Sequence, residues 1–284
     1  MSVEAELQVP RQQWLNHMDS ARSALVTLLA TYVYPDPKPV STAAFVHALG
    51  LLGFNEKAIR QALIRIRTSG LLNTVKVGRR SLWELSSTGY QLMDEGMHRL
   101  ESLNREDRAW DGRMYLVSVD VPQRDRAIRH TITTRLGWAG YASIAPTLWV
   151  STNPAAEQVA QRLMAELELP SFSLVAEHGA IGDIHRVIRD AWDLPGVAVE
   201  YRTFIDEFSS MQPRNPDDYF VARAQIGHQW RRFPFIDPGL PREMLPKNWA
   251  GVPASKLYRK LRGRWHGPAS ERWSELNLAA DGKI

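Results

Sequence analysis

The chain has 284 residues, no cysteine and a formal net charge of +4, the balance of 35 lysines and arginines against 31 aspartates and glutamates. This length is sufficient for two or three domains, and the lack of cysteine excludes a disulfide framework and thiolate chemistry. No apolar run is long enough to span a membrane, and the first residues lack the apolar core of a signal peptide. We therefore expect a cytoplasmic protein with no membrane partner.

The first block, residues 1–103, is predicted to begin with three helices. The first runs from Ser20 to Tyr34, Ser41 caps the second, and Asn55 caps a third that ends near Ser69. The apolar residues of the third helix have the spacing of a single buried face, and they are Ile59, Ala62, Leu63 and Ile66. This face of the third helix is therefore predicted to be buried.

A short hairpin is predicted to follow the third helix. Residues 71–77 and 81–85 are two alternating runs joined by Gly78-Arg79-Arg80, which places two arginines at the tip. A further helix is expected from Thr88 to about Leu103. Two helices, a basic third helix and a basic hairpin together predict a winged helix-turn-helix DNA-binding domain.

The candidate DNA-contacting residues lie on the exposed side of the third helix and in the hairpin. They are Lys57, Arg60, Gln61, Ile64, Arg65, Arg67 and Thr68 on the helix, and Lys76, Arg79 and Arg80 in the hairpin. No acidic residue lies between Lys57 and Arg80. Polar side chains can read base edges, guanidinium groups can reach phosphates, and Ile64 can contact a thymine methyl. The alternative is a solvated basic face with Ile64 packed against a neighbour.

The second block, residues 104–182, has a different rhythm, with strands and helices in the order β-α-β-β-α-β. The strands are expected at Met114–Val121, Tyr141–Ile144, Leu148–Ser151 and Phe172–Ala176, and the helices at Pro122–Leu136 and from Pro154. This order predicts a ferredoxin-like domain. The third block, residues 183–284, is predicted to be helical and is rich in tryptophan and proline. The expected fold class is α+β.

Residues that could carry metal chemistry are few. Asp120 ends the first strand of the second block, where a single carboxylate makes a poor magnesium site, and we expect it to cap the following helix. Asp111 and Asp125 lie near it in sequence and leave open a metal site shared between two copies of the chain. His178, Asp183 and His185 match no zinc spacing and are interpreted as loop residues. No catalytic motif is present, so we expect no catalytic residue, no bound metal and no enzyme.

Three groups of motifs, one in each block, resemble the phenylacetate-catabolism repressors of the PaaX type. The first is Gly53-Phe54-x-Glu56-x-x-Ile59-Arg60-x-Ala62-Leu63-x-Arg65, with Gly78-Arg79-Arg80-Ser81-x-x-x-Leu85 and Gly89. The second is Trp110-Asp111-Gly112-Arg113-x-x-Leu116-Val117, with Pro122, Leu136-Gly137 and Leu148-Trp149-Val150-Ser151. The third is Asp237-Pro238-x-Leu240-Pro241, Leu245-Pro246, Trp249-x-Gly251 and Ala254.

The resemblance implies a winged-helix domain, a ferredoxin-like domain similar to a CRISPR-adaptation nuclease subunit, and a helical C-terminal domain. It also implies a homodimeric repressor of aromatic-compound catabolism genes that binds double-stranded operator DNA and is released by an aromatic acyl-coenzyme A such as phenylacetyl-coenzyme A, with no cofactor. The candidate lining for that effector is Trp230, Arg231, Arg232 and Phe233, and the alternative is that the two rings are core and the arginines a solvated edge. The alternative function is a metal-dependent nuclease that uses the ferredoxin-like domain.

Overall fold

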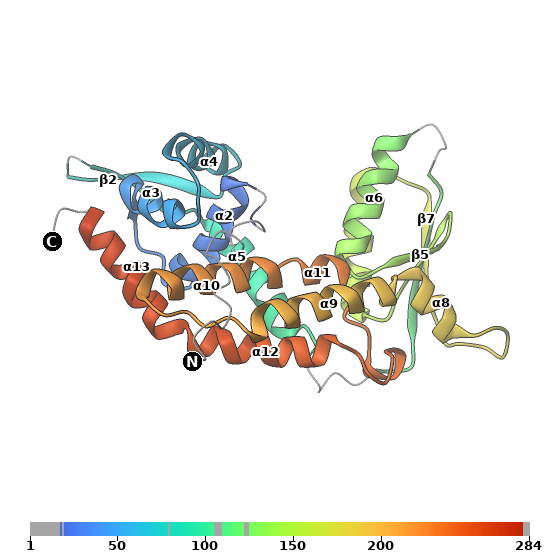
Figure 1. Cartoon of the computed structure of the whole chain (residues 1–284). Coiled ribbons are helices and arrows are strands. Elements are labelled where there is room, and N and C mark those ends of the chain that lie inside the picture. Colours follow the sequence, from blue (N-terminus) through green and yellow to red (C-terminus); the bar gives the residue numbers. More distant parts are fainter. Residues whose placement is uncertain (1–17, 19, 79, 105–109, 122–124, 281–284) are drawn as a thin grey trace, which may run out of the picture. The chain divides into compact units, whose positions relative to one another are not determined.

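The structure is a computed structural model that describes residues 18, 20–78, 80–104, 110–121 and 125–280 (Figure 1). The chain forms two compact units. The first contains Met1–Glu101, Glu207–Arg231 and Lys256–Ile284, and the second contains Ser102–Asp206 and Arg232–Ser255. The C-terminal helices therefore contribute to both units. Within the described residues, no helix is long and apolar enough to cross a membrane.

The first unit opens with the helices and the hairpin that the sequence predicted. Its elements in chain order are α2 (Ala21–Leu28), the π-helical turn η1 (Leu29–Val33), β1 (Val40–Ser41), α3 (Thr42–Leu51), α4 (Glu56–Thr68), β2 (Leu72–Val77), β3 (Arg80–Leu85) and α5 (Ser87–Ser102). It also contains α10 (Pro216–Trp230), most of α12 (Gly251–Arg264) and α13 (His266–Ala280).

Side chains cap the first helices where the sequence indicated. The Ser41 hydroxyl accepts a hydrogen bond from the Ala44 amide at 3.1 Å, and the Asn55 side chain accepts one from the Ala58 amide at 2.9 Å. Helix α5 starts slightly earlier than expected, because Ser86 rather than Thr88 accepts from the first turn. These caps satisfy backbone amides that have no partner within the helix.

The strands of the first unit form an antiparallel sheet in the order β1-β3-β2. Strand β1 has only two residues and was not predicted, since two residues show no alternation; it pairs Val40 with Trp83. The hairpin turn is also tighter than predicted. Val77 pairs directly with Arg80, which makes Arg80 the first residue of β3, and Gly78 has a φ of 61° in the turn.

The core of the first unit lies between its N-terminal and C-terminal helices. The predicted stripe of α4 is buried, and it packs with buried residues of α2 and α3. Helices α10 and α13 join the same core, where the Phe220 ring stacks on Tyr32 with centroids 4.7 Å apart and Trp273 packs beside both. The N-terminal block is thus completed by helices from the far end of the chain.

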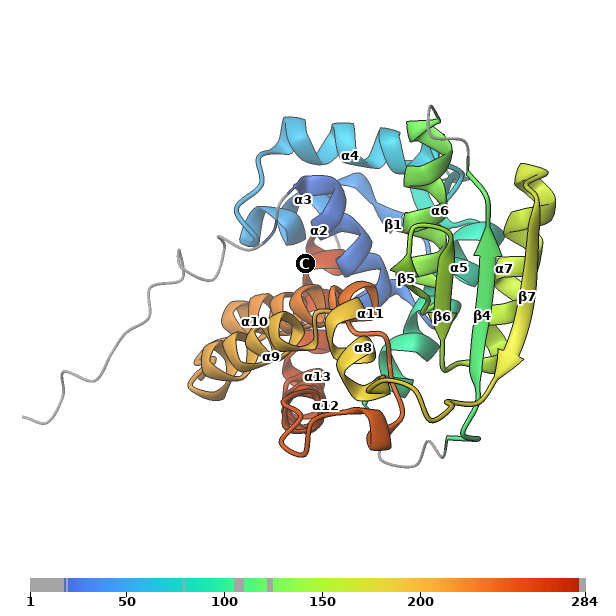
Figure 2. The ribbon, with the colours of Figure 1, turned by 90° about the vertical axis from the view of Figure 1, so that its right-hand side faces the viewer.

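The second unit is built on a four-stranded antiparallel sheet in the order β5-β6-β4-β7 (Figure 2). Its elements follow the predicted β-α-β-β-α-β order and are β4 (Met114–Val119), α6 (Arg126–Trp138), β5 (Ala142–Ala145), β6 (Leu148–Ser151), α7 (Pro154–Leu167) and β7 (Ser171–Ala176). Helices α6 and α7 bury their apolar residues against one face of this sheet. On the other face, Phe172 and Leu174 of the edge strand β7 are 60% and 55% exposed.

The start of α6 differs from the sequence interpretation. The side chain of Asp125 caps this helix and accepts from the Ile128 amide at 3.0 Å, whereas Asp120 is exposed at the end of β4. The predicted capping role of Asp120 is therefore wrong, because the helix begins too late in the chain for Asp120 to reach its first amides. The predicted helix start at Pro122, like most of the segment between the first two blocks, lies outside the described residues.

In the rest of the second unit, a partly buried hydrogen-bond network joins Asn104, Tyr201, Asp237 and Trp249. This part contains α8 (Ile184–Ala191), α9 (Leu194–Ser209), α11 (Phe233–Ile236) and the 3-10 turn η2 (Arg242–Met244). Asp237 accepts from the Tyr201 hydroxyl at 2.5 Å and from the Asn104 amide group at 2.9 Å, and the Trp249 indole donates to the Asn104 side-chain oxygen at 2.8 Å. Asp237 and Trp249 of the third motif therefore both hydrogen-bond to the same side chain, that of Asn104. This shared contact is a structural role for the motif.

Candidate nucleic-acid interface

Helix α4 presents the predicted basic face to solvent. Its polar residues Lys57, Arg60, Gln61, Arg65, Arg67 and Thr68 are exposed. Ile64 is 52% exposed in the middle of this face, although it is apolar. Figure 1 shows α4 and the β2–β3 hairpin together on the side of the first unit that lies away from α10 and α12.

Arg60 differs from the other cations of α4, because an acidic residue of the same helix holds it. Its Nε and Nη2 both lie 2.7 Å from the Glu56 Oε1 in an i, i+4 pair whose side chains are more than half exposed. Within the described residues, no ion pair engages Arg65, Arg67 or Lys57. The spacing of Glu56 and Arg60 could have shown this pair in the sequence. The Nε of Arg60 can donate to a phosphate or a base only after it leaves Glu56.

The hairpin adds further exposed cations beside the helix. Lys76 in β2 and Arg80 in β3 are exposed, and Arg79 lies outside the described residues. The hairpin is fixed to the helices because the Trp83 indole donates to the Thr42 hydroxyl of α3 at 2.8 Å. The basic side chains of α4 and of the hairpin therefore stand on one supported framework.

The start of α5 is fixed to the end of α4 by a close backbone approach. The Ser86 hydroxyl donates to the Gly70 carbonyl at 2.6 Å, and the Ser86 amide donates to the Leu71 carbonyl at 3.1 Å. A Cβ atom added at Gly89 would collide with that same Leu71 carbonyl oxygen. Only glycine fits at this position, which explains its place in the first motif.

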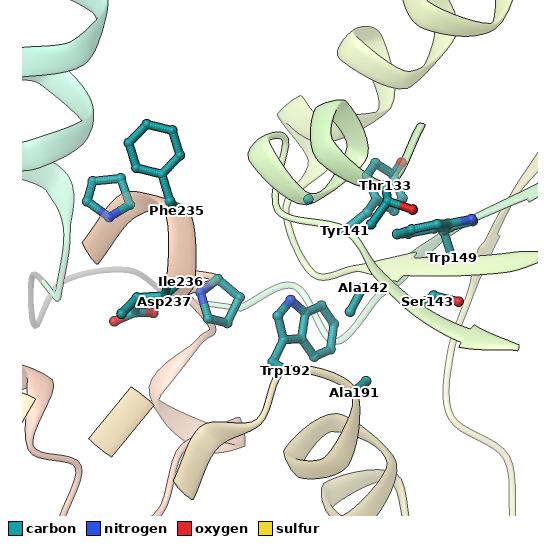
Figure 3. A pocket seen from close by; sticks show the side chains of 13 residues that line it. Thr133, Tyr141, Ala142, Ser143, Trp149, Ala191, Trp192, Phe235, Ile236 and Asp237 are labelled. Atoms are coloured by element: carbon teal, nitrogen blue, oxygen red, sulfur yellow. The ribbon is translucent and has the colours of Figure 1, made fainter. Parts of the chain in front are cut away.

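The second unit contains a cavity of about 300 Å³ with aromatic walls (Figure 3). Trp192 and Phe235 lie on one side of it, and Tyr141, Thr133 and Trp149 lie on the other. Its described lining residues include no lysine or arginine. Such walls suit an uncharged planar group. This site could not be recognised in the sequence, because its residues come from three separate segments.

The residues predicted to line an effector site are divided between the two units. Trp230 is fully buried and stacks on Tyr258 with centroids 4.6 Å apart, while Phe233 is 4% exposed and stacks on Tyr201. Arg231 hydrogen-bonds Ser23. The remaining residue, Arg232, lies 4.0 Å from the Glu200 carboxylate at the surface. The part played by these four residues in effector binding stays a prediction.

The candidate metal ligands are dispersed. Among the residues that the structure describes, no three histidine, aspartate or glutamate side chains come together where they could hold a metal ion. Asp183 caps α8 by accepting from the His185 and Arg186 amides at 3.0 and 3.2 Å. The Asp111 carboxylate accepts from the Arg113 amide and the Tyr115 hydroxyl, both at 2.9 Å. These hydrogen bonds, the Arg113 amide first, lower the pKa of the Asp111 carboxyl.

Comparison with known proteins connects all three blocks to one family. The family model described as PaaX-like protein matches residues 20–89, the PaaX protein central Cas2-like domain matches residues 107–183, and the PaaX-like protein C-terminal domain matches residues 192–275. The chain is also 29% identical over 219 residues to the Transcriptional repressor PaaX of Escherichia coli (strain K12), which covers 72% of this chain and 68% of that protein.

A solved structure has the same fold. It is that of an uncharacterized protein from Mycobacterium tuberculosis, with a TM-score of 0.58, 20% sequence identity, and coverage of 91% of this chain and 99% of that one. The three family models follow one another from residue 20 to residue 275 with only short gaps, and the chain therefore belongs to the PaaX-like protein family.

Proposed function

We propose that this protein is a DNA-binding transcriptional repressor with a winged helix-turn-helix, in which α4 is the recognition helix and the β2–β3 hairpin is the wing. The observation that carries the proposal is the exposed face of α4, where cations surround Gln61 and Ile64. A helix of this kind fits the major groove, with polar side chains at the bases and cations at the phosphates. The likeness to a transcriptional repressor of Escherichia coli supports the same function.

Repression is proposed to end when an aromatic acyl-coenzyme A binds. The cavity of Figure 3 suits the aromatic end of such a molecule, because Trp192 and Phe235 offer stacking surfaces and none of its described lining residues carries an amine or a guanidinium. A ring of that size fills only part of 300 Å³, and the coenzyme would extend outward. The effector must bind the DNA-incompetent state more tightly, and typical couplings weaken DNA binding by about 5- to 150-fold.

The repressor is proposed to act as a homodimer on a pseudo-palindromic operator. One recognition helix reads too few base pairs to select a genomic site. The β7 edge of the second unit's sheet, where Phe172 and Leu174 are exposed on the face away from α6 and α7, offers an apolar surface for a second copy of the chain. Half-sites should then lie about 10 base pairs apart, or a multiple of that distance.

Selection of binding sites from a pool of random duplexes tests the function directly. The full chain should enrich an inverted repeat, and in Mg²⁺ it should retard that duplex without cleaving it. Gln61→Ala or Arg65→Ala should weaken binding to the selected site by about 1–3 kcal/mol if the residue contacts a base. The control is Arg259→Ala, which removes an exposed arginine from α12. Normal binding by both α4 variants would rule out α4 as the recognition helix, and cleavage of the duplex would favour the nuclease function.

A further inference from the structure

Arg223 on α10 is a buried cation that forms no ion pair with an acidic residue in the part of the chain that the structure describes. The residue is only 5% exposed. Its Nη1 donates to the Arg262 carbonyl at 2.8 Å, and its guanidinium carbon lies 5.9 Å from the centre of the Tyr32 ring. Its Nε is buried and has no hydrogen-bond partner among the described residues. Burial lowers the pKa of this guanidinium, yet arginine remains charged in proteins.

A small cavity of about 40 Å³ adjoins this group inside the first unit. Three arginines line it, namely Arg223, Arg231 and Arg262, together with Thr27, Thr31 and Tyr258. None of the described residues that line the cavity is an aspartate or a glutamate. Glu101 pairs with Arg262 at 3.3 Å and is about half exposed. The cavity is therefore cationic and has hydroxyl groups at its wall.

An unpaired guanidinium inside a protein is costly, because burial removes its hydration without supplying a counter-charge. An oxyanion in the cavity would supply both the missing charge and an acceptor for the Arg223 Nε. The cavity exceeds the roughly 10–15 Å³ that one water molecule needs, and it is far too small for a nucleotide. The geometry points to a binding site for one compact oxyanion, a phosphate or a carboxylate, either free or as the end of a larger ligand.

The position of the site connects it to the helices under the basic face. Thr27 and Thr31 come from α2 and its π-helical continuation, and the buried side of α2 packs against α4. At Gly227, α10 approaches the π-helical turn η1 closely, because an added Cβ would lie 3.4 Å from the Thr31 hydroxyl. A bound oxyanion would thus join α2 to α10 and α12. Oxyanion binding can be measured on the protein without DNA, so its test does not depend on the proposed DNA binding.

Thermal unfolding of the full chain in increasing inorganic phosphate, at constant ionic strength with chloride, tests the proposal. A single site predicts little change in Tm below the phosphate Kd and, above it, a Tm that rises with the logarithm of phosphate concentration, by roughly 5–10 °C at 100 times the Kd. A parallel series with acetate separates the two oxyanions. A response to phosphate alone identifies a phosphate site, a response to acetate alone a carboxylate site, and either result supports the proposal. Phosphate also raises the Tm of proteins that have no phosphate-binding site. Variants of the cavity arginines therefore distinguish binding at this site from that general effect.

Arg223→Met should abolish the logarithmic rise of Tm with phosphate, and Arg262→Met should raise the phosphate Kd by about tenfold or more, since charged hydrogen bonds are lost. Arg259→Met removes an exposed arginine from the same helix as Arg262 and should respond like the wild type. If Arg223→Met does not fold, calorimetric titration of Arg262→Met with phosphate decides instead. The proposal is overturned if these variants show the same phosphate and acetate dependence as the wild type.

Discussion

Replacing Glu56 with glutamine should tighten the binding of the protein to duplex DNA by about fivefold. In the free protein Arg60 is held by Glu56 at 2.7 Å, and both side chains are more than half exposed. Exposed pairs at i, i+4 contribute only about 0.3–0.5 kcal/mol, so leaving Glu56 costs Arg60 little. A carboxylate about 8 Å from a phosphate adds a repulsion of about 0.5 kcal/mol in water. Together these effects amount to about 1 kcal/mol, or roughly fivefold in affinity.

The assay is fluorescence anisotropy with a mixed-sequence duplex in low and moderate salt. The slope of log affinity against log salt should stay the same, because Arg60 makes the same contact in both complexes. Asp190→Asn is a matched control, since it removes one charge from an exposed i, i+4 pair with Arg186 on α8. If Glu56→Gln binds DNA within twofold of the wild type, Glu56 and DNA do not compete for Arg60 and the reasoning is refuted.

Three further predictions concern stability. Gly89→Ala should lower the free energy of unfolding by about 1–3 kcal/mol in urea titration, because its Cβ would collide with the Leu71 carbonyl, whereas Gly96→Ala, with open space around it, should not. Tyr201→Phe should cost about 1–3 kcal/mol by the same measurement, since the buried Asp237 carboxylate loses a donor; equal stability would show that water replaces the hydroxyl. The lowered pKa of Asp111 means that its hydrogen bonds stabilise the fold above the ordinary aspartate pKa and are lost as pH falls through the lowered value. The difference in stability between the wild type and Asp111→Asn should therefore shrink on acidification, and a constant difference from pH 7 to pH 2 would contradict this.

The sequence by itself determined the local features of the molecule. The caps at Ser41 and Asn55, the buried stripe of α4 and the β-α-β-β-α-β order all follow from interactions between residues a few positions apart, and these leave a period in the sequence. The exposed basic face of α4 follows for the same reason, because once one face of a helix is buried, the residues on the opposite face are exposed to solvent. The Asp125 cap was missed because two nearby aspartates offered the same chemistry and only the start of α6 distinguishes them.

The tertiary structure alone decided what each buried face meets. Tyr32 stacks on Phe220, which is far along the chain, so the core of the first unit includes helices that the sequence assigned to a separate block. The convergence of Arg223 and Arg262 on one cavity, and of Trp192 and Phe235 on the other, has the same origin. Periodicity shows which side of a helix avoids water, but the choice of partner depends on the complementary shapes of surfaces that come together only in the folded chain.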